Sequence, residues 1–187
     1  MFLHRLFLVC MLMSVSVFFA QDDFTAQHTI SIGLTEVALM SIEGDQGTSV
    51  VLGAQSNEAG EALDFTTDSS LWVNYSSVIA SNDAKRKIVA SITQGSLPAG
   101  IKLRVIASDY EGVGDGLLGK PRNKEINLNA RLKTVIRRIG TCYTGEGVGN
   151  GHRLNYRLQV GGGENDYENI RAIENTTLVV TYTILDN

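Results

Sequence analysis

The amino-acid sequence predicts an all-β fold, a single antiparallel β-sandwich of about ten short strands. Two observations predict it. Short runs rich in Val, Ile, Thr and Tyr alternate apolar with polar residues, which suits strands that bury one face. Clusters of Gly, Pro, Asn, Asp and Ser separate these runs at short intervals, as turns do. Because no stretch has a convincing helical period longer than two turns, we expect no regular helix.

The predicted strands follow one another from residue 30 to the end of the chain. The first alternates Ile30, Ile32 and Leu34 with small or polar residues, and the last, at 178–184, has the strongest pattern. The others lie at 37–42, 50–52, 63–65, 71–75, 88–92, 101–106, 126–128, 132–139 and 154–158. Turns are expected at 56–57, 81–83, 97–100, 120–123 and 161–163, and 164–174 is either a long loop or one helical turn.

Residues 1–20 predict a secretory signal peptide. Arg5 precedes an apolar run at 6–19, and polar residues resume at Gln21. The run is shorter than the roughly 20 apolar residues that a membrane-spanning helix needs, and cleavage is expected after Ala20. An uncleaved N-terminal anchor is the alternative, because Phe18 stands where a small residue is preferred. The expected mature domain is therefore 21–187, exported and without a transmembrane segment.

Composition excludes two broad classes of protein. The 187 residues carry a formal net charge of −4, which becomes −5 when Arg5 leaves with the signal peptide. This balance argues against a nucleic-acid or anionic-membrane binder that works through a basic surface. A hydrophobic content of 43% with 19% charged residues excludes intrinsic disorder. Cationic clusters at 85–87 and at Lys133, Arg137 and Arg138 predict solvated strand faces, with a phosphate or acidic-glycan site as the alternative.

One cysteine remains after export. Cys10 lies in the signal peptide, so the mature chain keeps only Cys142 and has no internal disulfide. We expect Cys142 to be a small buried hydrophobe, and an intermolecular disulfide is the alternative.

Two nearly identical glycine-rich hexapeptides form the one internal repeat. Residues 111–116 are EGVGDG and residues 146–151 are EGVGNG. Alternate glycines let another backbone approach closely, so we expect two stacked loops at one end of the sandwich. The alternative is a calcium site, because carboxylate and amide oxygens are calcium ligands, although the spacing fits no EF-hand. Its ligands would be Asp109, Glu111, Asp115, Glu146 and Asn150.

Four aromatic residues are candidates for ligand binding: Trp72, Tyr75, Tyr110 and Tyr143. Trp72 and Tyr75 are three residues apart, so a regular strand directs them to opposite faces, one into the core and one outward. Trp72 is expected in the core. If it is instead exposed, it offers a ring on which a sugar could stack, as in a carbohydrate-binding module.

No catalytic motif stands out, and we expect no enzyme. The spacing Gly114, Gly119, Lys120 resembles a phosphate-binding loop, but Pro121 replaces the residue that would hold magnesium. The mature chain has only His28 and His152, both expected at the surface, and no nucleophile elbow. A Cys142–His152 pair and a pair of carboxylates for glycoside hydrolysis remain as alternatives.

Several segments resemble small exported proteins of Bacteroidetes-type bacteria: 28–30, 37–39, 71–75, 97–100, 139–145 and 180–184. This resemblance implies a Gram-negative envelope or extracellular location and carries no catalytic residues. The closing Thr181-Tyr182-Thr183 strand has a looser similarity to pilin and spore-coat-U-like β-sandwiches. The usual pilin disulfide is missing here.

The function expected from these features is that of a structural or adhesive protein of the bacterial envelope or surface, for which a fimbrial, pilin-like subunit is one form. It would contact copies of itself or another envelope protein through strand edges. Residues 29–34 are expected to pair as the first strand within their own sheet, and donation of this strand to a neighbour is the alternative. A carbohydrate- or ligand-binding module is the second hypothesis and a hydrolase the third, and no cofactor is expected apart from the calcium alternative.

Overall fold

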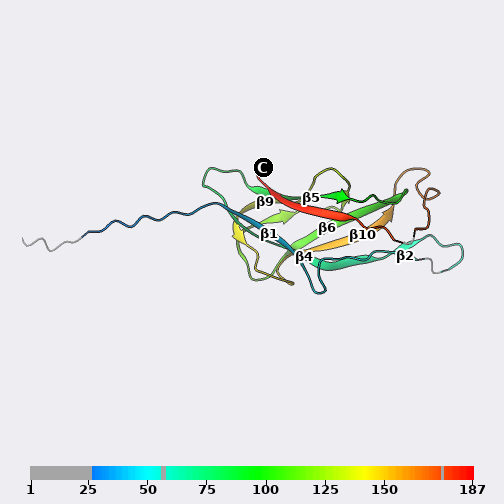
Figure 1. Ribbon diagram of the computed structural model, residues 1–187, viewed down its shortest axis with the longest axis horizontal. Helices are drawn as coiled ribbons and strands as arrows, with labels where there is room; N and C mark the ends of the chain where they lie inside the picture. The colour runs from blue at the N-terminus through cyan, green and yellow to red at the C-terminus, as the bar shows by residue number, and fades with distance from the viewer. Residues whose placement is uncertain (1–26, 56–57, 174) are drawn as a thin grey trace, which may run out of the picture. The chain divides into compact units, whose positions relative to one another are not determined.

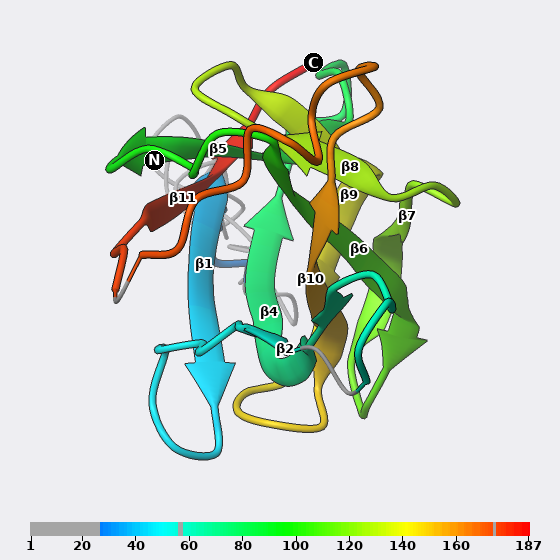
Figure 2. The same ribbon diagram turned by 90° about the vertical axis from the view of Figure 1, so that its right-hand side faces the viewer.

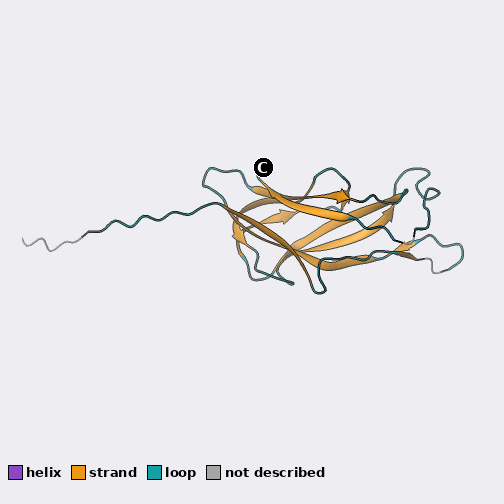
Figure 3. Cartoon of the chain, in the orientation of Figure 1, coloured by secondary structure: helices purple, strands orange, loops and turns teal. Residues whose placement is uncertain are grey.

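The computed structural model describes residues 27–55, 58–173 and 175–187. The predicted signal peptide at 1–20 and the predicted turn at 56–57 lie outside the described residues. The chain divides into two units, of which Thr35–Asn187 contains all the strands found among the described residues. The described residues contain strands and loops but no helix, which confirms the all-β prediction (Figure 3). None of them, accordingly, forms a helix of the length and hydropathy that a membrane crossing requires.

The described residues form eleven strands (Figure 1). They are β1 (Val37–Gly44), β2 (Ala54–Gln55), β3 (Asp64–Phe65), β4 (Thr67–Val78), β5 (Arg86–Gln94), β6 (Ile101–Glu111), β7 (Asp115–Pro121), β8 (Ile126–Leu128), β9 (Lys133–Tyr143), β10 (Gly151–Val160) and β11 (Val179–Leu185). Two predicted strands are wrong. Residues 30–34 have no assigned secondary structure, and 50–52 form a loop in which Val50 and Leu52 pack against the core.

All strand pairs are antiparallel, and nine strands belong to one sheet that folds over itself into two layers. One layer is β1-β4-β10-β6-β8 and the other is β11-β5-β9-β7. The layers are joined where β9 pairs with β4 at Ser76–Tyr143 and Ser77–Cys142. Figure 2 shows β1, β4 and β10 side by side, with β11 next to β1. The structure is therefore the predicted sandwich, closed at one end by the β4–β9 pairing.

The core fills the space between the two layers. On β6 the side chains alternate, with Leu103, Val105 and Ala107 buried and the residues between them partly exposed. Val73 of β4, in the same layer, and Ile88 of β5, in the opposite layer, are fully buried in the same core cluster. Cys142 belongs to the same cluster, which confirms it as a buried hydrophobe. Burial raises the pKa of its thiol to about 11, which keeps it protonated and unreactive at neutral pH.

A buried cation, Arg86, stands at one end of the sandwich. It is 5% exposed, and its Nη1 donates to the carbonyl oxygens of Val37 and Val78 and to Ser77 Oγ. Its remaining nitrogens pair with Glu36 and Asp186, both at 2.9 Å. Since the two carboxylates are largely exposed, most of the stabilisation comes from the buried carbonyl and hydroxyl groups that the guanidinium satisfies.

Replacing this guanidinium is expected to destabilise the domain. Arg86→Met keeps the aliphatic bulk but leaves buried acceptors without a donor, and should lower the free energy of unfolding by about 2–3 kcal/mol in urea titrations. Arg131→Met, at an exposed position, is the control and should change the stability little. Equal stability of the two variants would contradict the role given to Arg86.

Candidate functional site: the seam between two strand edges

Two neighbouring strands each pair on one side only within the described residues. β1 pairs with β4, β11 pairs with β5, and their free edges approach each other at the side of the sandwich. We call the pair of edges the β1–β11 seam. A free edge presents unpaired backbone N–H and C=O groups, on which another strand can form hydrogen bonds.

The core is incompletely covered along this seam. Neither β1 nor β11 contains a fully buried residue, whereas β5 contains a run of five. The alternate side chains that pack on the core from the seam are all partly exposed: Met40 and Ile42 from β1, and Val180, Tyr182 and Ile184 from β11. Apolar area thus remains in contact with water at a place where the backbone also lacks partners.

Arg86 defines one end of the seam. It binds the carbonyl oxygen of Val37, where β1 begins, and the carboxylate of Asp186, directly after β11 ends. The two strands therefore run in opposite directions along the seam. A strand placed between them would be parallel to one and antiparallel to the other.

A pair of tyrosine hydroxyls lies beside the seam. Tyr182 of β11 and Tyr156 of β10 share a hydrogen bond of 2.6 Å that links the two layers. Burial raises the pKa of Tyr156 to about 12, and burial also raises the pKa of Tyr182. Both phenols stay neutral at physiological pH, so the link is maintained in any ordinary buffer.

The unit before the β domain supplies an apolar segment. Residues 29–34, which we call the donor segment, have no assigned secondary structure. Their apolar side chains are highly exposed, at 71% for Ile30, 84% for Ile32 and 91% for Leu34. Three exposed apolar side chains at every second position are the pattern of a strand without a sheet.

The glycine-rich hexapeptides form the second candidate region, and they stack as predicted. Asn150 Oδ1 accepts a hydrogen bond from the Val113 amide, and its amide nitrogen donates to the carbonyl oxygen of Glu146. Gly114 lies against the backbone of Tyr143 and Thr144. The close approach explains why a residue without Cβ stands at this position.

The alternative for these loops, a calcium site, finds no support among the described residues. The described residues contain no group of three or more His, Cys, Asp or Glu side chains placed to hold a metal ion. The predicted ligands bind the protein itself: Asp115 accepts from its neighbouring amide, Glu111 lies near Arg153, and Asn150 bridges the two loops. Asp109 and Glu146 do not join them in a cluster.

Two of the four aromatic candidates are buried. Trp72 and Tyr75 lie on opposite faces of β4, as their spacing predicts, but the expectation that Trp72 is the core residue is wrong. Tyr75 is 3% exposed in the core. Trp72 lies outside the core cluster on the opposite face, yet it is only 4% exposed, with the Arg153 guanidinium 4.8 Å from its ring centroid. Tyr110 bridges the loops by donating to Thr144 and accepting from Gly114, so only Tyr143, 52% exposed, offers an accessible ring.

His152 is buried, not at the surface as the sequence indicated. Its Nδ1 lies 2.9 Å from the Ser108 carbonyl oxygen, which can only accept, so Nδ1 carries a proton. Its Nε2 lies 3.0 Å from the hydroxyl oxygen of Tyr75, which itself donates to the Leu118 carbonyl oxygen. Burial lowers the pKa of His152, and this effect is larger than the opposing effect of its hydrogen bonds to backbone carbonyl groups and of the Asp109 charge. Burial raises the pKa of Cys142 at the same time. Both shifts oppose the thiolate–imidazolium pair that cysteine catalysis uses.

Comparisons of the chain with protein-family profiles, with curated proteins and with solved structures found no match. Function is therefore argued from the geometry of the seam and the surfaces around it.

A methyl group at Gly114 should push the stacked loops apart. The Cβ of Gly114→Ala would lie 2.7 Å from the Thr144 Cα and closer still to the Tyr143 carbonyl oxygen, both on backbone that cannot move aside. We expect a loss of about 1–3 kcal/mol in urea unfolding. Gly53→Ala is the control, because a Cβ there meets nothing within 4 Å. Similar stabilities for both variants would refute the close packing.

The buried His152 predicts a loss of stability in mild acid. Below about pH 6.5 the histidine of the unfolded chain takes up a proton, whereas the buried His152 of the folded protein resists protonation. The unfolded state then binds more protons, so the free energy of unfolding decreases as the pH is lowered. His152→Gln removes the proton and should flatten the decline between about pH 7 and 5, measured by urea titration. His28→Gln, at an exposed position, should keep the decline. An unchanged slope in His152→Gln would contradict this assignment.

Proposed function

We propose that the protein is an exported structural or adhesive subunit of a Gram-negative envelope or surface that assembles by strand addition. In this proposal the donor segment of one copy pairs with the β1–β11 seam of the next. The observation that carries it is the coincidence of two unpaired, incompletely buried edges with an exposed segment of alternating apolar residues. Export rests on the sequence of residues 1–20.

The donor segment and the β1–β11 seam have complementary chemistry. A donated strand gains backbone hydrogen bonds from the edges, and its alternate side chains enter the gaps between alternate core-facing residues of the seam. Six extended residues span about 20 Å, close to the length of the seven-residue β11. Burying Ile30, Ile32 and Leu34 contributes about 5–8 kcal/mol before the costs of association.

Chain connectivity favours a neighbouring copy over self-pairing. Only Thr35 and Glu36 separate the donor segment from β1, so folding back onto β1 needs a two-residue turn. Such turns favour Gly, Asn or Asp, because they require positive φ. Glu36 is moreover held by the buried Arg86. Donation in trans avoids this turn.

Two hypotheses receive less support: a module that stacks a sugar on Trp72, and a hydrolase. Trp72 is only 4% exposed, and the Arg153 guanidinium lies over its ring. A sugar could stack on this ring only if the covering side chains moved away. The histidine and cysteine that a hydrolase would use are buried with pKa values shifted away from catalysis. We therefore propose no catalytic residue.

A charge in the donor segment should abolish assembly without unfolding the domain. Ile32→Asp puts a carboxylate where the proposal buries an apolar side chain, so sedimentation should show monomers where the wild type forms oligomers. Ser31→Asp, on the opposite face of the same segment, is the matched control and should still assemble. Both variants should keep the wild-type urea midpoint. A wild type that stays monomeric, or Ile32→Asp oligomers, would refute the proposal.

A second experiment tests the seam directly. Deleting residues 21–35 leaves the strands intact but removes the donor segment. Adding a peptide of residues 27–36 should then raise the melting temperature of the truncated protein, because the peptide binds only the folded seam. A peptide of the same composition in scrambled order should have no effect, and equal effects would argue against strand pairing.

A further inference from the structure

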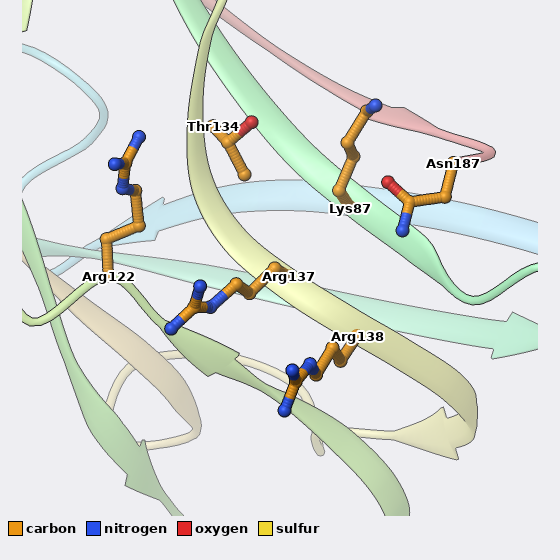
Figure 4. Close-up of a pocket in the computed structure, with 6 residues that line it drawn as sticks. All are labelled: Lys87, Arg122, Thr134, Arg137, Arg138 and Asn187. Atoms are coloured by element: carbon orange, nitrogen blue, oxygen red, sulfur yellow. The ribbon is translucent and has the colours of Figure 1, made fainter.

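A cluster of cations lies on the outer side of the β5–β9–β7 layer. It surrounds a hollow of about 350 Å³, which we call the basic hollow (Figure 4). Its lining residues are Lys87, Arg122, Thr134, Arg137, Arg138 and Asn187. Lys87 comes from β5, Arg137 and Arg138 from β9, and Arg122 follows directly after β7. The fold thus brings together cations from three places in the sequence.

A bulge in β9 directs two of the arginines to the same side. Between the pairs Arg86–Ile139 and Ile88–Ile136, β5 advances by two residues and β9 by three. The extra residue breaks the alternation, so Arg137 and Arg138 are both exposed between buried neighbours, and Figure 4 shows both leaving β9 towards the same side. Arg138 adopts φ +62°, a conformation that costs energy for a side chain other than glycine.

Among the described residues, the side chains of Lys87, Arg122, Arg137 and Arg138 form no ion pair and no hydrogen bond, whereas Arg86, Arg104, Arg153 and Arg157 each pair with a carboxylate. Two carboxylates bind other arginines instead. Glu125 binds Arg104 and Arg157, and Asp186 binds Arg86. Four like charges gathered without partners repel one another, although the chain as a whole is acidic. An anion bound among them would remove this repulsion.

A second, smaller hollow of about 240 Å³ adjoins the first. It is lined by Arg122, Asn123, Lys124 and Arg137 and so shares two arginines with the basic hollow. Adjacent hollows with shared cations suit a ligand that carries successive anionic groups. Arginine forks bind carboxylate and sulfate groups through two parallel hydrogen bonds. No aromatic residue lines either hollow, so neither offers the aromatic rings on which the bases of single-stranded nucleic acids stack.

We propose that the two hollows form a binding site for an anionic polysaccharide that carries carboxylate or sulfate groups. The site is independent of strand addition, because it uses no residue of the seam or of the donor segment. It would give a subunit of the proposed surface assembly a means of attachment to an acidic glycan, whether or not assembly occurs.

Calorimetric titration of the purified protein tests the site. Polygalacturonate and heparin should bind and neutral dextran should not, with affinity decreasing as salt is raised from about 50 mM. The double variant Arg122→Gln/Arg137→Gln removes the cations shared by the hollows and should weaken binding by about tenfold or more. Lys85→Gln/Arg131→Gln changes the net charge equally at exposed positions outside both hollows, and should keep the wild-type affinity.

Three results would overturn the proposal. The first is a wild type that binds neither polymer at low salt. The second is an equal loss of affinity in the control variant, which would indicate attraction by overall charge instead of a site. The third is tighter binding of oligothymidylate or of inorganic phosphate through the same two arginines, which would assign the site to another ligand class. Urea midpoints equal to that of the wild type would show that both variants are folded.

Discussion

The guanidinium of Arg86 is the interaction on which the arrangement of the strand edges depends. A sandwich of two layers has to hold the start of one edge strand and the end of another in place without a covalent link, because the only cysteine of the described domain is buried and unpaired. Arg86 does this with five donors, which reach β1, β4, the residue after β11 and the residue before β1. A lysine, with a single compact ammonium group, could not contact all of these partners at once.

Local backbone distortions determine what the outer surfaces present. Regular strands would place Arg137 and Arg138 on opposite faces, and one of them would then be in the core. The bulge opposite Lys87 prevents this and keeps Ile136 and Ile139 buried on either side of the arginines. In the stacked loops, Gly114 permits a backbone contact that any side chain would block. The bulge thus exposes two arginines, one of which a regular strand would bury. The glycine allows two loops to pack more closely than a side chain would permit.

The sequence predicted the strands because burial of one face leaves a period of two, and this period is visible wherever a strand borders the core. It misassigned residues 30–34, where the period is present but no partner strand is assigned, and it missed β7, whose glycines resemble a loop. The surface position expected for His152 was wrong because its hydrogen-bond partners, Ser108 and Tyr75, are distant in sequence. The cationic clusters were visible in the sequence, but the contribution of Arg122 and the withdrawal of Arg86 into the interior depend on pairing between distant strands.

The position of Arg86 also constrains the kind of assembly that strand donation would produce. Glu36, the second residue after the donor segment, is bound to the same guanidinium that marks the end of the seam. The donor segment and the seam are different surfaces, so a contact between them joins unlike parts of two copies and leaves one donor and one seam free at the ends. Such a contact propagates into an open filament unless the rotation between copies closes a ring. Arg86 therefore binds, in one subunit, both a residue that closely follows the donor segment in the sequence and a residue at one end of the acceptor seam.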